Sequence, residues 1–152
     1  MVLAWLLDEE RPAWVDWFIE GVPEGRVHLL APSIIWLEIG NRLTRTRDIG
    51  DEFALEAMLK TEVLAIEEVP QTRPLRLRAL TLARGYGLSM YDATYLAAAE
   101  ATECRLLTLD ARLDRAASSM GLGREEGAAQ VSEPPATYGG RPVDTMSLAV
   151  IG

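Results

Sequence analysis

Apolar and polar positions alternate along this chain in a pattern that predicts short strands separated by helices. Apolar residues spaced three and four apart, as on the buried face of a helix, recur between short apolar runs bounded by proline or polar residues. The predicted helices are residues 2–8, 13–20, a segment after Pro32 that includes Leu43, 51–60, 72–84, a segment opened by Ser89 and one opened by Asp110. The predicted strands are residues 26–30, 63–69 and 105–109. Strands separated by helices favour an α/β fold with a parallel sheet covered on both faces.

The predicted helix after Pro32 carries apolar residues along one side, and the predicted helix over 51–60 also contains several apolar residues. The residues along one side of the helix after Pro32 are Ile34, Ile35, Leu37 and Leu43, and the apolar residues of the helix over 51–60 are Phe53, Leu55, Met58 and Leu59. Gly85 and Gly87 are expected to end the helix over 72–84.

The character of the chain changes near Gly121. Residues 121–142 are rich in Gly, Glu, Pro and Ser without apolar periodicity, which predicts an irregular segment. The apolar stretch 146–152 is expected either to add an edge strand over 146–151 or to form a disordered end. The sequence therefore divides into a folded domain over 1–120 and a C-terminal tail over 121–152.

Composition points to a globular cytoplasmic protein of one domain. The chain has 152 residues, of which 49% are hydrophobic, enough to build one core. No apolar run reaches the roughly 18–20 residues that a membrane span needs, and the opening residues lack the basic start of a secretory signal. The single cysteine, Cys104, excludes an internal disulfide and fits a reducing compartment. With only one histidine as well, the chain disfavours a zinc site of the His/Cys type.

The net charge of −8 argues against non-specific adhesion to nucleic acid through overall charge. It does not exclude a local basic strip, because all but one of the 15 basic residues are arginine and several are clustered. Such a strip could hold phosphates. A solvated helix face is the more ordinary interpretation of any single cluster.

Three carboxylates inside otherwise apolar elements are the candidate functional residues. Glu38 interrupts an apolar stripe, where a glutamate is seldom buried without a partner, and Asn41 lies one turn on along the same face. Asp110 directly follows a predicted strand, at the edge where α/β sheets bind ligands, although aspartate there is also a good helix N-cap. Asp92 stands three residues after Ser89, which is also the spacing of a capping box. Taken singly each residue favours a structural role, whereas together they favour a cluster.

An acidic cluster is unfavourable when empty, because its carboxylates repel and raise one another's pKa values. A hard divalent cation relieves this repulsion, and Mg²⁺, with Mn²⁺ as the other option, suits an all-oxygen set of ligands. Such an ion can activate a water molecule and neutralise a phosphodiester oxygen. Since the chain has no suitable His or Cys, metal-assisted hydrolysis is the predicted chemistry.

Two motifs resemble the PIN domain family, specifically the VapC toxins of bacterial toxin–antitoxin pairs. They are YDATYLAAAEATECRLLTLDARL, residues 91–113, and the E-x-x-N of LEIGNRL, residues 37–43. The resemblance spans residues 1 to about 120. It implies a three-layer α/β/α sandwich, Mg²⁺-dependent endoribonuclease activity on RNA, frequent homodimers and a small antitoxin bound across the active-site groove.

The resemblance also assigns roles to particular residues. Glu38, Asp92 and Asp110 match the family's acidic metal-site positions, and Asp114 matches an occasional additional carboxylate. Supporting positions are Asn41 and the small hydroxyl residue Thr108. The arginines expected to hold the RNA backbone are Arg42, Arg45 and Arg112.

The chain departs from the family at its start. Family members open with a central hydrophobic strand that ends in a metal-binding aspartate, and a helix similar to VLAWLLDEE follows. In this chain, Met1 falls where that helix has already begun, so the strand and its aspartate are missing. Asp8 is not expected to replace that aspartate, because it lies near the far end of the helix. Either the start codon is assigned too late, which we favour, or the chain is truly short and its nuclease function impaired. A third possibility is that residues 146–152 fill the vacant position in the sheet.

Two other functional classes remain open from the sequence. One is a catalytically impaired binding module that engages an antitoxin-like partner through a hydrophobic groove rich in Trp14, Trp17 and Trp36. The other is a phosphoacceptor domain of the receiver type. That class ranks low, because it needs a lysine after the last strand and the only lysine is Lys60.

Overall fold

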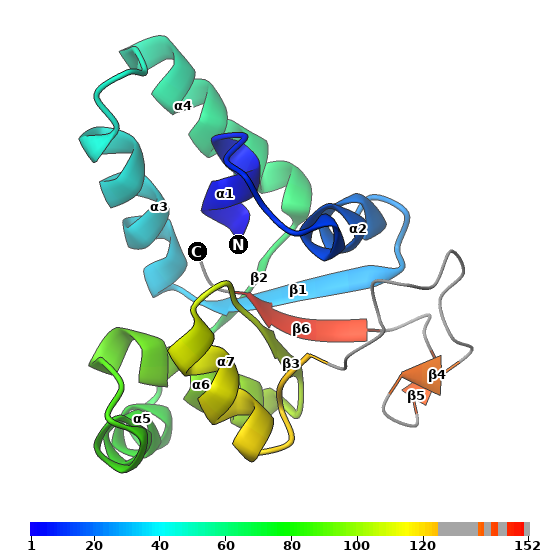
Figure 1. The fold of residues 1–152 in the computed structure, drawn as a ribbon, viewed down its shortest axis with the longest axis vertical. Helices are drawn as coiled ribbons and strands as arrows, with labels where there is room; N and C mark the ends of the chain where they lie inside the picture. The colour runs from blue at the N-terminus through cyan, green and yellow to red at the C-terminus, as the bar shows by residue number, and fades with distance from the viewer. Residues whose placement is uncertain (125–136, 139–140, 143–145, 151–152) are drawn as a thin grey trace.

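A computed structural model describes residues 1–124, 137–138, 141–142 and 146–150 of the chain (Figure 1). The helices are α1 (Val2–Leu6), α2 (Ala13–Gly21), α3 (Ile34–Arg45), α4 (Asp51–Lys60), the 3₁₀ helix η1 (Thr61–Leu64), α5 (Arg73–Tyr86), α6 (Met90–Thr102) and α7 (Ala111–Ser119). The strands are β1 (Val27–Pro32), β2 (Glu67–Val69), β3 (Arg105–Leu107), β4 (Thr137–Tyr138), β5 (Arg141–Pro142) and β6 (Met146–Val150).

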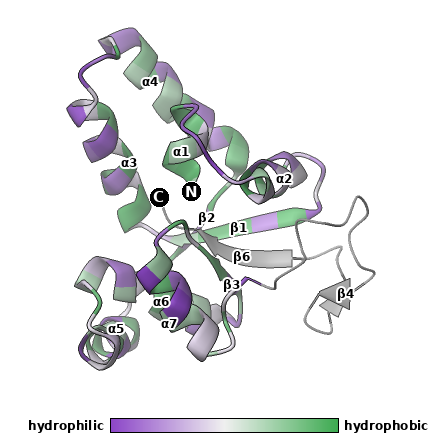
Figure 2. Ribbon diagram, viewed as in Figure 1, coloured by the Kyte–Doolittle hydropathy of each residue, from purple (hydrophilic) through white to green (hydrophobic). Residues whose placement is uncertain are grey.

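The main sheet has four parallel strands in the order β2-β1-β6-β3. Helices α1 to α4 cover one face of it and α5 to α7 cover the other, which gives three layers (Figure 1). The predicted α/β class with a parallel, doubly covered sheet is therefore confirmed. Hydrophobic residues are concentrated along β1 and in α1, where these elements approach the middle of the molecule (Figure 2).

The C-terminal strand β6 lies in the interior of the sheet. It pairs with β1 on one side, where Leu29 is opposite Leu148, and with β3 on the other, where Leu107 is opposite Val150. The expectation of an edge strand at 146–151 or a disordered end is therefore wrong, and so is the expectation that the sheet lacks a central strand. The third possibility, that the C-terminal stretch fills the vacant position in the sheet, agrees with the position of β6. An almost wholly apolar segment without polar alternation suits a parallel strand that is covered on both faces.

Helix α6 packs close to the sheet through small side chains. Ala97, Ala98 and Ala99 are all buried, and their single methyl groups allow the helix to lie close to the strands. Because α6 carries Asp92 near its first turn, this packing fixes where that carboxylate lies relative to the sheet.

Three details of the predicted elements are corrected by the fold. Leu37 is 68% exposed, because the buried side of α3 follows Ile35, Ile39 and Leu43 at the helical repeat. The strand predicted from residue 63 begins only at Glu67, since residues 61–64 form η1. The helix predicted to stop at Gly85 continues to Tyr86 and ends at Gly87, whose positive φ of 62° suits glycine.

Helix α4 exposes most of its large apolar side chains. Phe53, Leu55 and Leu59 are all exposed, and Ala57 is the buried residue of this helix. Propensity and spacing predicted the helix correctly, but not the direction in which its apolar residues point.

The segment predicted to be irregular lies largely outside the described residues. Within it, β4 and β5 form an antiparallel pair in which Thr137 is opposite Pro142 and Tyr138 is opposite Arg141. Across the part of the chain that the structure describes, no helix combines the length and the apolar character that crossing a membrane requires.

Candidate functional site

Two of the predicted carboxylates, Glu38 of α3 and Asp92 of α6, lie close together. Glu38 is half-buried, and burial is the main reason why the pKa of its carboxyl is raised above the ordinary value. A hydrogen bond from Tyr95 opposes this shift, and the negative charge of Asp92 raises the pKa further. The charge of one carboxylate therefore acts directly on the other.

Tyr95 is a member of this site that the sequence did not reveal as functional. Its hydroxyl donates a hydrogen bond to Oε2 of Glu38, and its side chain is almost fully buried. Burial, followed by the contact with Glu38, raises the pKa of Tyr95, so the hydroxyl keeps its proton. The available signal was a tyrosine in an alanine-rich buried helix, since a buried tyrosine hydroxyl usually needs a partner.

Asp92 is held by the N-cap of its own helix. The hydroxyl of Ser89 donates to Oδ2 of Asp92 at 2.7 Å and accepts from the backbone N–H of Asp92 at 3.1 Å. The capping interpretation of the Ser89–Asp92 spacing is thus correct, and it coexists with the position of Asp92 beside Glu38. The cap fixes the first turn of α6 and with it the carboxylate.

Asp110 caps α7. Its Oδ1 accepts hydrogen bonds from the backbone N–H groups of Arg112 at 2.8 Å and Leu113 at 2.9 Å. The backbone N–H of Asp110 in turn donates to Oγ1 of the buried Thr108 at 2.9 Å, and Asp114 lies one turn further along α7. Within the described residues, no three His, Cys, Asp or Glu side chains gather closely enough to hold a metal ion. The structure therefore brings Glu38 and Asp92 together, while a metal-binding role for Asp110 and Asp114 stays a prediction.

A groove of about 610 Å³ is lined by Glu38 and by three other residues predicted to belong to the site, Asn41, Arg42 and Arg45. Its walls are formed by Leu3, Ile34, Leu37, Glu38, Asn41, Arg42, Arg45 and Tyr91. Two of the predicted RNA-binding arginines are thus on the same groove as Glu38. The exposed ring of Tyr91, next to Asp92, also lines it, and the sequence analysis did not single it out.

The arginines differ in their surroundings. Arg42 forms an ion pair with Glu9 at 2.6 Å between Nη2 and Oε1, whereas Arg45 is exposed on the wall of the groove. Arg112 is not part of the groove wall. Its guanidinium lies against Gly87, where an added Cβ would come within 2.8 Å of Nη2.

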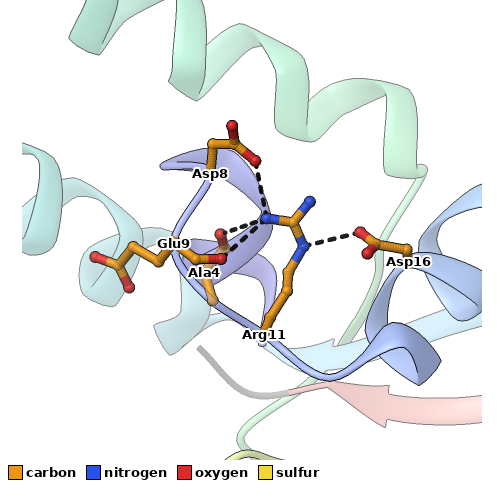
Figure 3. Close-up of polar contacts among 5 residues, drawn as sticks. All are labelled: Ala4, Asp8, Glu9, Arg11 and Asp16. Atoms are coloured by element: carbon orange, nitrogen blue, oxygen red, sulfur yellow. Dashed lines mark hydrogen bonds and ion pairs between the residues drawn. The ribbon is translucent and has the colours of Figure 1, made fainter.

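Asp8 lies just beyond the end of α1 and contacts Arg11. Arg11 binds it at 3.1 Å, pairs with Asp16 at 2.8 Å and donates to the backbone carbonyls of Ala4 and Glu9 (Figure 3). This guanidinium fixes the end of α1 and the turn into α2. The interior strand β6 carries no carboxylate, so neither Asp8 nor β6 supplies a further acidic side chain to the site.

The donor set fits a hard divalent cation. Mg²⁺ is commonly held by one or two carboxylates and keeps several water molecules, which matches Glu38 on the wall of an open groove with Asp92 near it. Burial and the charge of Asp92 raise the pKa of Glu38, and a cation bound nearby would oppose this shift. Asn41 adds a neutral oxygen donor to the same groove.

The three tryptophans of the alternative hypothesis do not form one groove. Trp14 and Trp17 pack edge-on against Phe18, with ring centroids 6.1 and 4.8 Å away. Trp36 donates from its indole nitrogen to Oε1 of Glu68 at 2.8 Å. None of the three lines the groove beside Glu38.

Comparison with known proteins agrees with the architecture and the motifs. The family model described as PIN domain matches residues 1–119. The chain has no significant match among curated proteins or among solved structures. PIN domains are generally metal-dependent nucleases that act on RNA. Because the matched segment covers most of the chain, including Glu38, Asp92 and Asp110, the chain belongs to the PIN domain family.

Proposed function

We propose that this protein is a Mg²⁺-dependent endoribonuclease of the VapC type, the toxin of a toxin–antitoxin pair. The observation that carries the proposal is the pairing of Glu38 with Asp92 beside a groove that also bears Asn41, Arg42 and Arg45. A carboxylate on the groove wall with a second one near it can hold a cation, and arginines on the same wall can bind phosphates. These are the parts that phosphodiester hydrolysis needs. The PIN family membership supports RNA as the substrate.

Glu38 and Asp92 would hold the ion, with Mn²⁺ as an alternative to Mg²⁺ and with Asp110 and Asp114 as further carboxylates. A bound ion would lower the pKa of a water molecule and offset the charge that develops on the phosphate. Arg42 and Arg45 would bind phosphates flanking the scissile bond, and Arg112 would extend this contact. Asn41 and Thr108 would support the carboxylates.

By resemblance, a small antitoxin would cover the groove, two copies of the chain would form a dimer and the protein would act in the cytoplasm.

The test is cleavage of RNA by the purified chain in the presence of Mg²⁺, Mn²⁺ or EDTA. Glu38→Gln and Asp92→Asn keep the shape of each side chain and remove its charge. We expect each to lower the rate about 100-fold or more, as when an electrostatic stabiliser of a transition state is lost. Glu20→Gln, an exposed glutamate of α2 outside the site, is the matched control and should cleave like the wild type. Equal activity of all variants, or activity that survives EDTA, would contradict the proposal.

A second candidate is a catalytically impaired binding module. It is favoured by the observation that the described residues gather only two of the predicted carboxylates into one site. It predicts that a small partner protein binds the purified chain, while neither Mg²⁺ nor Mn²⁺ does. Calorimetric titration with Mn²⁺ separates the two candidates before any RNA is added.

A further inference from the structure

Tyr95 joins the two helical layers of the molecule at the candidate site. It lies on α6, one turn after Asp92, and its hydroxyl bonds to Glu38 on α3, 57 residues away in the sequence. Because α3 and α6 cover opposite faces of the sheet, this hydrogen bond connects the layers directly (Figure 1). Asp92 and Tyr95, three residues apart on one helix, therefore both act on Glu38.

The environment of Tyr95 leaves its hydroxyl little freedom. The side chain is 1% exposed, and its neighbours on α6 are buried as well. A tyrosine ring packed in this way has two torsions, both restricted by the core, so its hydroxyl is a fixed point. The glutamate it contacts has three torsions and is only half-buried, so without the bond its carboxylate would sample several positions.

We propose that Tyr95 is a positioning residue, which holds one carboxylate oxygen of Glu38 so that the other is presented to a divalent cation in the groove. The inference rests on the proposed function, because it takes Glu38 as a ligand of that cation. Ligand carboxylates commonly need such a hydrogen-bonding partner to fix their orientation. The competing interpretation is that Tyr95 is only a core residue whose hydroxyl happens to find an acceptor.

Tyr95→Phe separates these interpretations, because it keeps the ring and removes the hydroxyl. Mn²⁺ affinity is measured by calorimetry on the full chain, and thermal unfolding is recorded in EDTA. We expect Mn²⁺ to bind about 10- to 100-fold more weakly, the usual loss for a partner of a metal ligand. Thr94→Val is the matched control, since the Thr94 hydroxyl is also buried on α6 but donates to the backbone carbonyl of Met90 at 2.7 Å. Its Mn²⁺ affinity should equal that of the wild type.

A double-mutant cycle tests whether Tyr95 acts through Glu38. In a Glu38→Gln background, Tyr95→Phe should weaken Mn²⁺ binding no further, whereas a general packing defect would add to the first loss. If the wild type binds Mn²⁺ and Tyr95→Phe binds it equally well, the positioning role of Tyr95 is overturned while the proposed function stands. Additive losses in the cycle would overturn it as well. A wild-type chain that binds neither Mn²⁺ nor Mg²⁺ would overturn the proposed function together with this inference.

Discussion

At the scale of single residues, carboxylates in this protein combine a structural role with a predicted chemical one. Asp92 and Asp110 both take part in capping the helices that begin beside them. A capping aspartate still has oxygen lone pairs for a second ligand, because each carboxylate can accept about four hydrogen bonds or metal contacts. Capping therefore does not exclude metal binding, and it holds the side chain in place.

Asp110 allows the two roles to be separated. Asparagine caps helices about as well as aspartate, so Asp110→Asn should leave the stability of α7 nearly unchanged, while Asp110→Ala should cost about 1 kcal/mol. If Asp110 is also a metal ligand, both variants should lose Mg²⁺-dependent RNA cleavage. Urea unfolding measures the first effect and a cleavage assay measures the second. Wild-type cleavage by Asp110→Asn would leave Asp110 with capping alone.

The sequence predicted part of this site because part of it is local. Glu38 stands out as a carboxylate within an apolar stripe, and the caps at Ser89 and Asp110 follow from short-range spacing. Tyr95 was missed because a tyrosine in a buried helix is usually a core residue, and its partner is distant in the sequence. The proximity of Glu38 to Asp92, by contrast, depends on how α3 and α6 meet at the sheet.

At the scale of elements, α5 and α6 are linked by a bidentate ion pair. Nε and Nη2 of Arg78 donate to the two carboxylate oxygens of Glu100 at 2.6 and 2.7 Å. Hydrogen bonding to Arg78 is the main reason why the pKa of Glu100 is lowered from 4.5. The pair lies at the surface, where solvent screens most of its attraction.

The ion pair should contribute about 0.5 kcal/mol to stability, because both side chains are more than one third exposed. The folded protein keeps Glu100 charged at a pH where the unfolded chain begins to protonate it. The contribution is therefore complete above the ordinary pKa of 4.5 and is lost as the pH falls through the lowered pKa. Glu100→Gln should be less stable than the wild type at pH 7, with the difference vanishing in acid. Urea unfolding across this pH range measures it, and a difference that grows in acid would contradict the assignment.

Most elements were predicted from the sequence, whereas their surroundings were not. Helices α2, α3 and α6 begin within one residue of the expected positions, since proline and N-caps are local signals. The strand expected from residue 63 was shortened because η1 takes its first half, ending at Ala65 with a positive φ of 43°. The exposed apolar residues of α4 show that spacing predicts a helix but not which side meets the core.

At the scale of the whole molecule, the sheet depends on a strand from the far end of the sequence. β6 separates β1 from β3, which pair with it and not with each other. The apolar composition of residues 146–150 predicted a strand, yet nothing local could place it in the interior. That placement follows from completing hydrogen bonds along both neighbours, which is a property of the assembled sheet.

A proline in β6 tests this topology. Ala149 is opposite Leu30 on β1 and Leu106 on β3, so its backbone N–H has a neighbouring strand whichever way it points. Ala149→Pro removes that donor and introduces a ring where both sides are occupied, which excludes proline from central strands. We expect the free energy of unfolding to fall by about 3 kcal/mol or more, a large share of the roughly 5–15 kcal/mol of a typical domain. Urea unfolding followed by circular dichroism measures this loss.

The control places the same substitution where the backbone accepts it. Ala13 is exposed and is the first residue of α2, a position whose N–H has no partner within the helix and whose φ suits proline. Ala13→Pro should therefore unfold at nearly the wild-type urea concentration. If Ala149→Pro behaves in the same way, β6 does not occupy the interior of the sheet. If it unfolds early, as expected, the two halves of the sheet, which carry Glu38 after β1 and Asp110 after β3, are joined by the C-terminal strand.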